Sequence, residues 1–493
     1  MRPHGSVHLF RCWLCGAVCA AGMALVTQAS DAVAGASPSG PDYRVFVNGR
    51  AIELVEALKP DKYYSIHLTD EQAQPYWAAL VDATGEVEVR VESDCRDLSA
   101  TRILPVKPGL TPVARTKDAV TFRAKVPFKV SVEPTPRFRS LAVVVREPDR
   151  DMPPDGAPGV RRFRRGRHHL DEPIRLGSNE TLYLDEGAFV EAAVYATGTN
   201  IAVRGHGVLS GACWPWRNGP APRLLKFEDA KDVLVRDVTL LGPYEWSFVL
   251  HRVERALVDG FVLLGGKVIN DDGIDICRSK DVTVRNSFIH TQDDCIAVKW
   301  SGEDILVEDC ILWADVARIF LVGFECDSTS IRKFRARNID VLHQSVAKPK
   351  GGPQAIVRID ASNGIRIGDI EFDGIGVWTP EPGDSFVLIS SSVIRAVKGW
   401  AWYDTAGSVD GVRIRNVRYR KPVPPGCGAV RIAGHDARAG VANVTIENVD
   451  HTPETLEIGA FVSGATFNGA PLQPLNESDS NGTMTTVKDK EVR

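Results

Sequence analysis

The chain carries a short, strand-only repeat that restricts the folds it can adopt. A polar pair precedes an alternating apolar run in residues 231–235, 254–258, 280–284 and 303–307. From Val233 through Leu257 and Val282 to Ile305 the steps are 24, 25 and 23 residues, and later copies begin at positions 364, 411 and 443. A β-propeller blade needs about 40 to 50 residues, whereas the shorter period suits a solenoid whose coils each add one rung to stacked parallel sheets. The repeat therefore predicts a parallel β-helix over residues 160–470.

The region before the repeat has a different pattern. Residues 41–149 contain short alternating runs, such as 43–47, 87–91 and 128–132, with turn residues between them. This pattern is typical of an antiparallel β-sandwich. Residues 149–159 are rich in Pro, Asp and Gly and form the predicted linker. The sequence thus predicts an all-β protein in which a right-handed parallel β-helix is preceded by an N-terminal antiparallel β-sandwich.

The first 34 residues have the features of a signal peptide. Arg2 and Arg11 flank a short polar start, residues 12–26 form an apolar run, and Ala32-Val33-Ala34 offers a cleavage site. An apolar run of this length is short for a membrane span but suits a signal-peptide core. We expect a mature chain that begins near Gly35 and is secreted, to the extracellular space or the periplasm, without insertion into the membrane. Residues 471–493 are expected to be a polar C-terminal tail.

Charge and cysteine content exclude several kinds of partner. The net charge of -4 provides no basic field for nucleic acid, and a composition of 44% hydrophobic and 25% charged residues is that of an ordinary soluble protein. Three of the ten cysteines lie in the predicted signal peptide, and the remaining seven form no C-x-x-C pair. A zinc site is therefore not expected, nor is any other metal or cofactor.

Two acidic clusters lie about one coil apart within the repeat. The first is in residues 270–276 and the second in residues 291–299, with Asp272 and Asp293 separated by 21 positions. Because rungs stack about 4.8 Å apart, residues one coil apart become neighbours on one face. Carboxylates held this close repel each other, which raises the pKa of at least one. A protonated acid beside ionised partners is what cleavage of a glycosidic bond requires.

The acidic residues of the repeat do not all suggest chemistry. Asp232, Asp281 and Asp304 each stand just before a strand, where Asp commonly satisfies a turn backbone. The adjacent pair Asp293-Asp294 fits that role poorly, because strand alternation would turn one of the two inward. Asp272, Asp293 and Asp294 are therefore the predicted catalytic residues.

The two clusters also carry a family resemblance. Asn-x-Asp-Gly at residues 270–273, followed by x-Asp-Asp-Cys-Ile-Ala-x-Lys at residues 292–299, resembles the polygalacturonase family, glycoside hydrolase family 28. The resemblance covers roughly residues 165–460 and implies hydrolysis with inversion, with Asp293 as general acid and Asp272 and Asp294 activating water. A sandwich ahead of a β-helix is also similar to the dextranase and isopullulanase family, glycoside hydrolase family 49.

The chain departs from the polygalacturonase pattern at two places. Residues 318–325 contain no counterpart of the family's Gly-His-Gly histidine, and Phe324 stands in or near its place. The family's Arg-Ile-Lys reads Arg358-Ile359-Asp360 here. A carboxylate at that point would repel a uronate, so we expect a polysaccharide or oligosaccharide substrate that is neutral, with Asp360 accepting hydrogen bonds from sugar hydroxyls. The residues expected to bind substrate are Asn270, Lys299, Trp300, Arg318, Glu325, Arg358 and Asp360.

Other functions are compatible with the same pattern. One is a polygalacturonase proper. Another is a Ca²⁺-dependent polysaccharide lyase, in which the aspartates hold the metal and Lys299 or Arg318 abstracts a proton. A third is a non-catalytic solenoid that binds carbohydrate, from which the acidic pair could be removed without loss of function.

Overall fold

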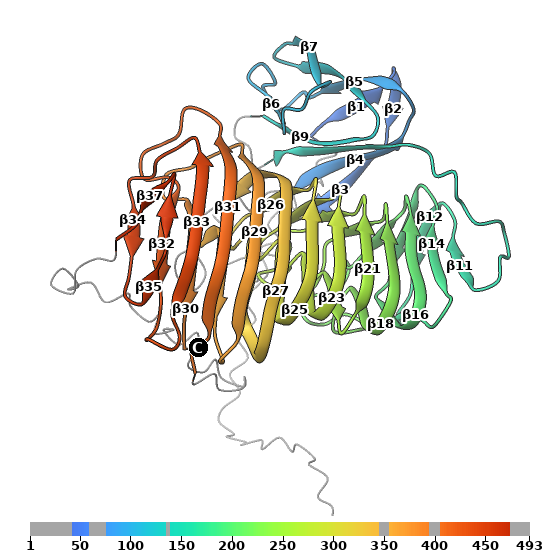
Figure 1. Ribbon diagram of the computed structural model, residues 1–493. Helices are drawn as coiled ribbons and strands as arrows, with labels where there is room; N and C mark the ends of the chain where they lie inside the picture. The colour runs from blue at the N-terminus through green and yellow to red at the C-terminus, as the bar shows by residue number, and fades with distance from the viewer. Residues whose placement is uncertain (1–41, 59–74, 135–138, 345–353, 394–404, 474–493) are drawn as a thin grey trace, which may run out of the picture. The chain divides into compact units, whose positions relative to one another are not determined.

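The computed structural model describes residues 42–58, 75–134, 139–344, 354–393 and 405–473. The predicted signal peptide, and the predicted tail apart from its first three residues, lie outside the described residues. Those that are described belong to one compact unit, Pro41–Arg493, and their regular structure consists of β-strands (Figure 1). Among them there is no helix long and apolar enough to cross a membrane.

The N-terminal domain is built from two five-stranded sheets around a shared apolar core. The first has the order β2-β1-β5-β8-β7 and the second β3-β4-β10-β9-β6. Their strands are β1 (Arg44–Val47), β2 (Arg50–Ile52), β3 (Leu54–Leu58), β4 (Tyr76–Asp82), β5 (Glu86–Glu92), β6 (Arg102–Leu104), β7 (Thr111–Arg115), β8 (Ala119–Lys125), β9 (Phe128–Glu133) and β10 (Leu141–Arg146). The sandwich differs from the purely antiparallel prediction at one pair, because β4 and β10 run parallel.

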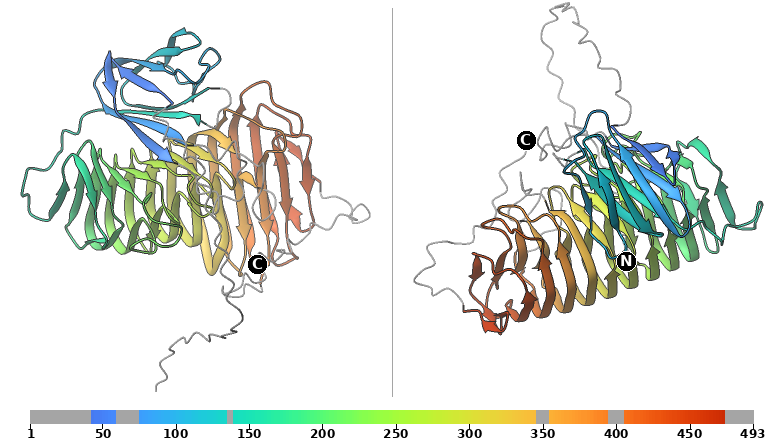
Figure 2. Two further views of the ribbon diagram at one scale, coloured as in Figure 1. Left: turned by 180° about the vertical axis from the view of Figure 1, so that it is seen from behind. Right: turned by 90° about the horizontal axis from the view of Figure 1, so that it is seen from above.

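The second region is a stack of parallel strands that continues to residue 467, after which the last strand, at residues 470–471, turns back and pairs antiparallel (Figures 1 and 2). Its first half contains β11 (Val160–Phe163), β12 (Gly166–His169), β13 (Ile174–Leu176), β14 (Thr181–Leu184), β15 (Ala188–Glu191), β16 (Val194–Gly205), β17 (Val208–Ser210), β18 (Leu225–Arg236), β19 (Thr239–Leu241), β20 (Phe248–His251), β21 (Glu254–Asp259), β22 (Val262–Leu264), β23 (Ile274–Arg285) and β24 (Phe288–Thr291). Its second half contains β25 (Ile296–Glu308), β26 (Ile311–Ala314), β27 (Phe320–Gln344), β28 (Ala355–Ala361), β29 (Arg366–Val377), β30 (Ser385–Ser391), β31 (Ser408–Tyr419), β32 (Ala429–Ala433), β33 (Val441–Val449), β34 (Leu456–Ile458), β35 (Val462–Ser463), β36 (Thr466–Phe467) and β37 (Ala470–Pro471). This is the predicted parallel β-helix.

The repeat corresponds to the coils, with one change of register. Val233 of β18 pairs with Ala256 of β21, Ala256 pairs with Val282 of β23, and Val282 pairs with Ile305 of β25. The sequence had aligned Leu257 with Val233, which is wrong by one residue. Ala256 is the buried member of that strand, with 5% of its surface exposed, and a shift of one residue would turn the apolar side chains outward.

Inward-facing side chains of successive coils form the core of the β-helix. Ile274, Ile296, Phe320, Val357 and Val387 are consecutive partners in adjacent strands and are all buried. At the bends the backbone takes left-handed conformations, as at Asp232, Asp281 and Asp304, with φ of 54°, 56° and 53°. Asp and Asn tolerate this conformation better than most residues, which explains why single aspartates stand at these bends. The bends lie inside β18, β23 and β25, not before the strands as the sequence predicted.

Apolar and polar contacts join the sandwich to the β-helix. One buried cluster includes Ala78 and Val144 of the sandwich together with Val262 and Leu264 of β22. The Glu133 carboxylate lies 2.8 Å from Nε2 of His343, and both side chains are almost fully buried. An uncompensated charge in such a contact would cost several kcal/mol, so the pairing helps to fix one domain against the other.

The seven cysteines of the described residues are all free. Cys277, Cys295 and Cys310 are buried among apolar side chains, where a thiol behaves as a small hydrophobic group.

Candidate active site

The turns before β23, β25 and β27 bring the predicted catalytic residues together. The backbone N–H of Gly273 donates to the carbonyl of Asp294, and that of Cys295 donates to the carbonyl of Arg318, at 2.7 and 2.9 Å. Asp272, Asp294 and Arg318 thus occupy neighbouring coils. Asp293 and Asp294 lie in the bend between β24 and β25 rather than on a strand. The alternation argument therefore does not apply to them, and the bend itself directs their side chains.

Asp272, Asp293 and Asp294 form a compact and buried triad. Each offers a carboxylate oxygen, and these oxygens all lie within 4.8 Å of one another. The exposed fractions of the three residues are 2%, 5% and 1%. Burial raises the pKa of Asp272 well above its ordinary value, with Lys299 opposing the shift. Burial likewise raises the pKa of Asp294, opposed mainly by Arg318, so Asp272 and Asp294 hold protons at a higher pH than exposed aspartates do.

Lys299 lies at the centre of a group of carboxylates. Its Nζ atom is 2.8 Å from Asp272, 2.8 Å from Asp275 and 3.3 Å from Glu325. Burial alone would lower the pKa of Lys299, but these carboxylates raise it well above the ordinary value. The Nζ atom also lies 3.7 Å from the centre of the Trp246 ring. Lys299 is thus a fixed cation that favours the ionised form of Asp272.

The Asp271 side chain accepts hydrogen bonds from the backbone of the site. It is fully buried, and its Oδ1 atom accepts the N–H groups of Gln292 and Asp293 at 2.7 and 3.2 Å. Burial raises the pKa of Asp271 to about 8, with the backbone hydrogen bonds opposing the shift. Asn270, predicted to bind substrate, lies beside Asp293, with its Nδ2 atom 3.5 Å from Oδ2 of that aspartate.

Two arginines and a phenylalanine form the next part of the site. Arg318 donates through its Nη2 atom to Asp294 at 2.8 Å and through its backbone N–H to the same carboxylate at 3.1 Å. Arg358 donates to Asp360 at 3.1 Å. The Phe324 ring lies between the two guanidinium groups, 5.9 Å from Arg318 and 5.3 Å from Arg358. Phe324, predicted to stand in or near the place of the family histidine, thus contacts both arginines.

Asp360 lies behind Arg358 rather than at an open surface. Only 2% of it is exposed, and its second oxygen accepts a hydrogen bond from the hydroxyl of Ser392. Both oxygens of Asp360 are thus engaged by the protein, so the predicted hydrogen bonds from sugar hydroxyls would have to compete with Arg358 and Ser392.

The aromatic residues at the site only partly match the prediction. Trp300 is partly exposed and lies between His251, with ring centres 5.3 Å apart, and Arg278, whose guanidinium is 5.3 Å from the ring. Trp246, which the sequence analysis passed over, contacts Lys299 as well as Arg223. Asp275, which was not among the predicted site residues, is buried against Lys299, and burial raises its pKa to about 6.

Two groups of described side chains could hold a metal ion. One is the triad itself, and the other is His169, Glu191 and Cys213 at the surface. The triad oxygens suit a hard cation such as Ca²⁺. Neither predicted lyase base is suited to abstracting a proton, however, because Lys299 is held in its protonated form and Arg318 is paired with Asp294.

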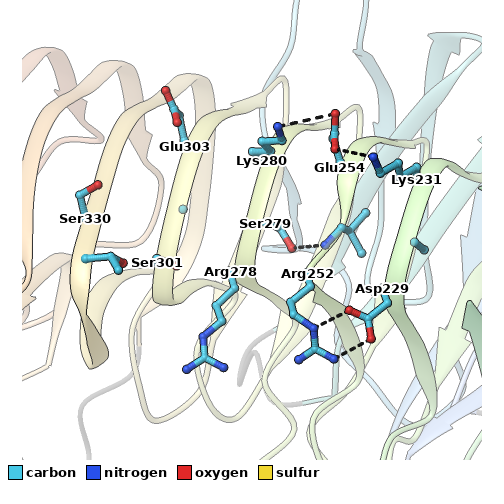
Figure 3. Close-up of a pocket in the computed structure, with 14 residues that line it drawn as sticks. Asp229, Lys231, Arg252, Glu254, Arg278, Ser279, Lys280, Ser301, Glu303 and Ser330 are labelled. Atoms are coloured by element: carbon cyan, nitrogen blue, oxygen red, sulfur yellow. Dashed lines mark hydrogen bonds and ion pairs between the residues drawn. The ribbon is translucent and has the colours of Figure 1, made fainter.

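A separate pocket of about 550 Å³ lies along another bend of the coils (Figure 3). Arg252 pairs with Asp229 there, and Glu254 bridges Lys231 and Lys280. None of the triad residues lines this pocket. These five side chains form ion pairs between neighbouring coils.

Comparison with known proteins supports the predicted relationship. Residues 186–313 match the family model of glycosyl hydrolases family 28. The polygalacturonase of Chamaecyparis obtusa is 28% identical over 188 residues, which are 35% of this chain and 34% of that protein. The probable rhamnogalacturonase A of Aspergillus niger is 22% identical over 303 residues, 60% of this chain and 61% of that protein. The chain therefore spans less than two thirds of these relatives.

A solved structure supports the fold over a longer stretch. Dex49A from Penicillium minioluteum matches with a TM-score of 0.60 at 14% identity, covering 88% of this chain and 89% of that one. This likeness confirms the predicted fold class. The predicted resemblance to polygalacturonase-like β-helix glycosidases is likewise confirmed, and the matched stretch contains Asp272, Asp293 and Asp294.

Proposed function

We propose that this chain is a glycoside hydrolase whose acid–base chemistry is performed by Asp272, Asp293 and Asp294. The observation that carries the proposal is the triad, whose carboxylate oxygens lie within 4.8 Å of one another in a buried cluster. Such a cluster can keep one carboxyl protonated and another ionised at the same pH. The family 28 match, which spans all three residues, is the second support.

The roles of the three aspartates follow the family resemblance. Lys299 lies beside Asp272 and Arg318 lies beside Asp294, and each cation opposes the rise in pKa that burial causes, which is compatible with these two as the bases. Asp293, next to the Asn270 amide, is the acid and gives its proton to the leaving oxygen as the bond from that oxygen to the anomeric carbon breaks. A water held by Asp272 and Asp294 bonds to the anomeric carbon and transfers its proton to them.

The proposed stereochemical outcome is inversion, as in the resembled family. In most inverting glycosidases the two carboxyl groups stand about 6.5 to 9.5 Å apart, a longer separation than the closest oxygens have here. Inversion is therefore supported by the resemblance and not by the spacing. Proton NMR of the first product tests it, because the anomer released before mutarotation must be opposite to that of the substrate.

The substrate is a neutral glycan. The site contains six carboxyl groups, those of Asp272, Asp275, Asp293, Asp294, Glu325 and Asp360, and three cations, Lys299, Arg318 and Arg358. Each of these cations already faces a protein carboxylate. Uronate binding needs a cation directed at the sugar carboxylate, and an added anion would meet like charges in a partly desolvated site.

A panel of polysaccharides tests both parts of this proposal. The purified mature protein should release reducing ends from at least one neutral glycan faster than from polygalacturonate. Equal or greater activity on polygalacturonate would reject the neutral substrate and leave a polygalacturonase. Asp360→Asn should weaken action on the neutral substrate, because Arg358 would lose its ionic partner.

The proposed enzyme is exported. Residues 1–34 should be removed, and mass spectrometry of exported protein should find an N-terminus near Gly35. Exported protein that still begins with Met1 would reject the signal peptide.

The triad oxygens could also hold Ca²⁺, which favours the lyase as a second candidate. Activity abolished by a chelator, together with an unsaturated product that absorbs in the ultraviolet, would identify a lyase. A hydrolase retains its activity in the chelator and gives no such product.

A further inference from the structure

Tyr76 connects the N-terminal sandwich to the catalytic region of the β-helix. It lies at the start of β4, and its hydroxyl donates to the backbone carbonyl of Gly265 at 3.0 Å. Its ring also packs on the His290 ring, with centres 4.8 Å apart. Tyr76 is buried, with 6% of its surface exposed. The hydroxyl therefore has a fixed partner across the domain boundary.

Gly265 opens a tight turn that leads directly to the acidic cluster. Its N–H donates to the carbonyl of His290 at 2.9 Å, and the next N–H, that of Gly266, donates to Oδ2 of Asp271. A side chain at Gly265 would collide with the His290 carbonyl and come within 2.9 Å of the Asp271 carboxylate. The close approach of these backbones explains the glycine.

Hydrogen bonds of Asp271 connect this turn to the backbone of Asp293, the proposed general acid. While Oδ2 accepts from Gly266, Oδ1 accepts the backbone N–H groups of Gln292 and Asp293. The Gln292 side chain completes this cycle of hydrogen bonds by donating to the Gly266 carbonyl at 2.7 Å. Any displacement of the Gly265–Gly266 turn thus moves the backbone that carries Asp293.

We propose that Tyr76 is a positioning residue for catalysis, through which the N-terminal sandwich holds Asp293 in place by way of Gly265 and Asp271. This rests on the proposed hydrolase activity. Loss of the tyrosine hydroxyl leaves the Gly265 carbonyl without its donor in a buried setting, and the turn shifts to relieve it. Small displacements of a catalytic group reduce turnover strongly, by about 10²-fold for 1 Å.

The matched pair Tyr76→Phe and Tyr43→Phe tests the proposal. Tyr43 is also buried in the sandwich, and its hydroxyl also donates to a backbone carbonyl, that of Arg139 within the same domain. Both variants remove one hydroxyl with a carbonyl partner. Tyr76→Phe should lower kcat about tenfold with KM changed less than twofold, since a shift well below 1 Å is expected. Tyr43→Phe should leave kcat unchanged at a similar loss of thermal stability.

A kcat of folded Tyr76→Phe within twofold of the wild-type value, or an equal fall in Tyr43→Phe, would overturn the proposal. Should Tyr76→Phe fail to fold, Asp271→Asn tests the same connection at the residue that contacts the Asp293 backbone. A wild-type kcat in that variant would likewise overturn the proposal.

Amide hydrogen exchange separates this proposal from the proposed function. The N–H groups of Gln292 and Asp293 should exchange faster in Tyr76→Phe than in the wild type or in Tyr43→Phe. Unchanged exchange in Tyr76→Phe would overturn the positioning role even in an active enzyme. If the N–H groups exchange faster in Tyr76→Phe but the wild-type protein cleaves no glycan, the link from Tyr76 to Asp293 is supported and the hydrolase activity is rejected.

Discussion

Aspartates pair with cations of neighbouring coils at two places on the β-helix, and their pKa values shift in opposite directions at the two places. At the exposed bend, Arg252 pairs with Asp229 and Arg255 pairs with Asp232, each with a guanidinium nitrogen 2.7 Å from the carboxylate. The arginine hydrogen bonds lower the pKa of both aspartates. These aspartates are ionised at any pH at which the enzyme would be used.

In the buried site, pairs of equal length have the opposite result. Asp272 is 2.8 Å from Lys299, and Asp294 is 2.8 Å from Arg318. Burial nevertheless raises the pKa of both aspartates. A cation next to a carboxylate therefore does not decide its acidity, because loss of hydration outweighs the pairing when the pair leaves water. Ion pairs between coils occur at both places, but burial raises the pKa only of the aspartates in the buried site.

The largest difference between the two regions should appear in catalysis. Asp293→Asn should reduce turnover by about 10²- to 10⁴-fold, because an amide cannot replace a general acid. Asp232→Asn, at the exposed bend, should retain wild-type turnover. The measurement is the initial rate of reducing-end release on the best substrate of the panel. Wild-type-like rates in Asp293→Asn would remove this residue from the acid role.

The next difference concerns stability. Lys299→Gln leaves Asp272, Asp275 and Glu325 without their shared cation and should cost about 3 to 5 kcal/mol of unfolding free energy. The loss should be larger at pH 8 than at pH 5, since protonation relieves the carboxylates at low pH. Arg255→Gln breaks an exposed pair and should scarcely move the unfolding midpoint. Equal effects of the two substitutions would contradict the importance of burial.

A smaller effect should appear in the pH dependence of stability. The folded chain keeps protons on Asp271, with a pKa of about 8, and on Asp275, with a pKa of about 6, whereas unfolded Asp releases them near pH 4. The folded state therefore binds more protons between these values, and this contribution to stability falls as pH rises from about 4 to 8. Midpoints of urea unfolding should show a shallower fall in Asp271→Asn. An unchanged slope would mean that Asp271 is ionised in the folded protein.

Asp232→Asn tests a pH dependence of the opposite sign. Because Arg255 lowers the pKa of Asp232, the stabilising contribution of Asp232 is present at neutral pH and is lost as pH falls below about 4. Urea unfolding of the variant should show a slight loss of stability at neutral pH, as for the other half of this exposed pair, and no loss in acid.

The β-helix and the grouping of the acidic residues could be predicted because both depend on spacing. A period near 24 residues sets the coil, and residues one coil apart are neighbours by construction, which applies to Asp272 and Asp294. The register of β21 was misjudged because Ala256 and Leu257 both fit an apolar inward position, and only packing selects Ala256.

Contacts that depend on loops and domain packing could not be read from the repeat. Trp246 precedes Asp272 by a coil that contains an irregular turn, so its place beside Lys299 depends on that turn. The parallel pairing of β4 with β10 and the reach of Tyr76 to Gly265 join segments far apart in sequence. The alternation of apolar and polar residues within a strand does not show which distant segments it contacts.

Cleavage in ¹⁸O-labelled water tests the central claim most directly, because hydrolysis must place one oxygen from water on each new reducing end. Mass spectrometry of products formed by the wild-type protein should find one ¹⁸O per cleaved bond, with no unsaturated sugar, and Asp293→Asn should form almost no product. Cleavage that yields unsaturated ends without ¹⁸O would contradict a hydrolase and indicate a lyase. Binding of glycans without any cleavage, equal in the wild type and in Asp293→Asn, would show that the buried aspartates perform no chemistry.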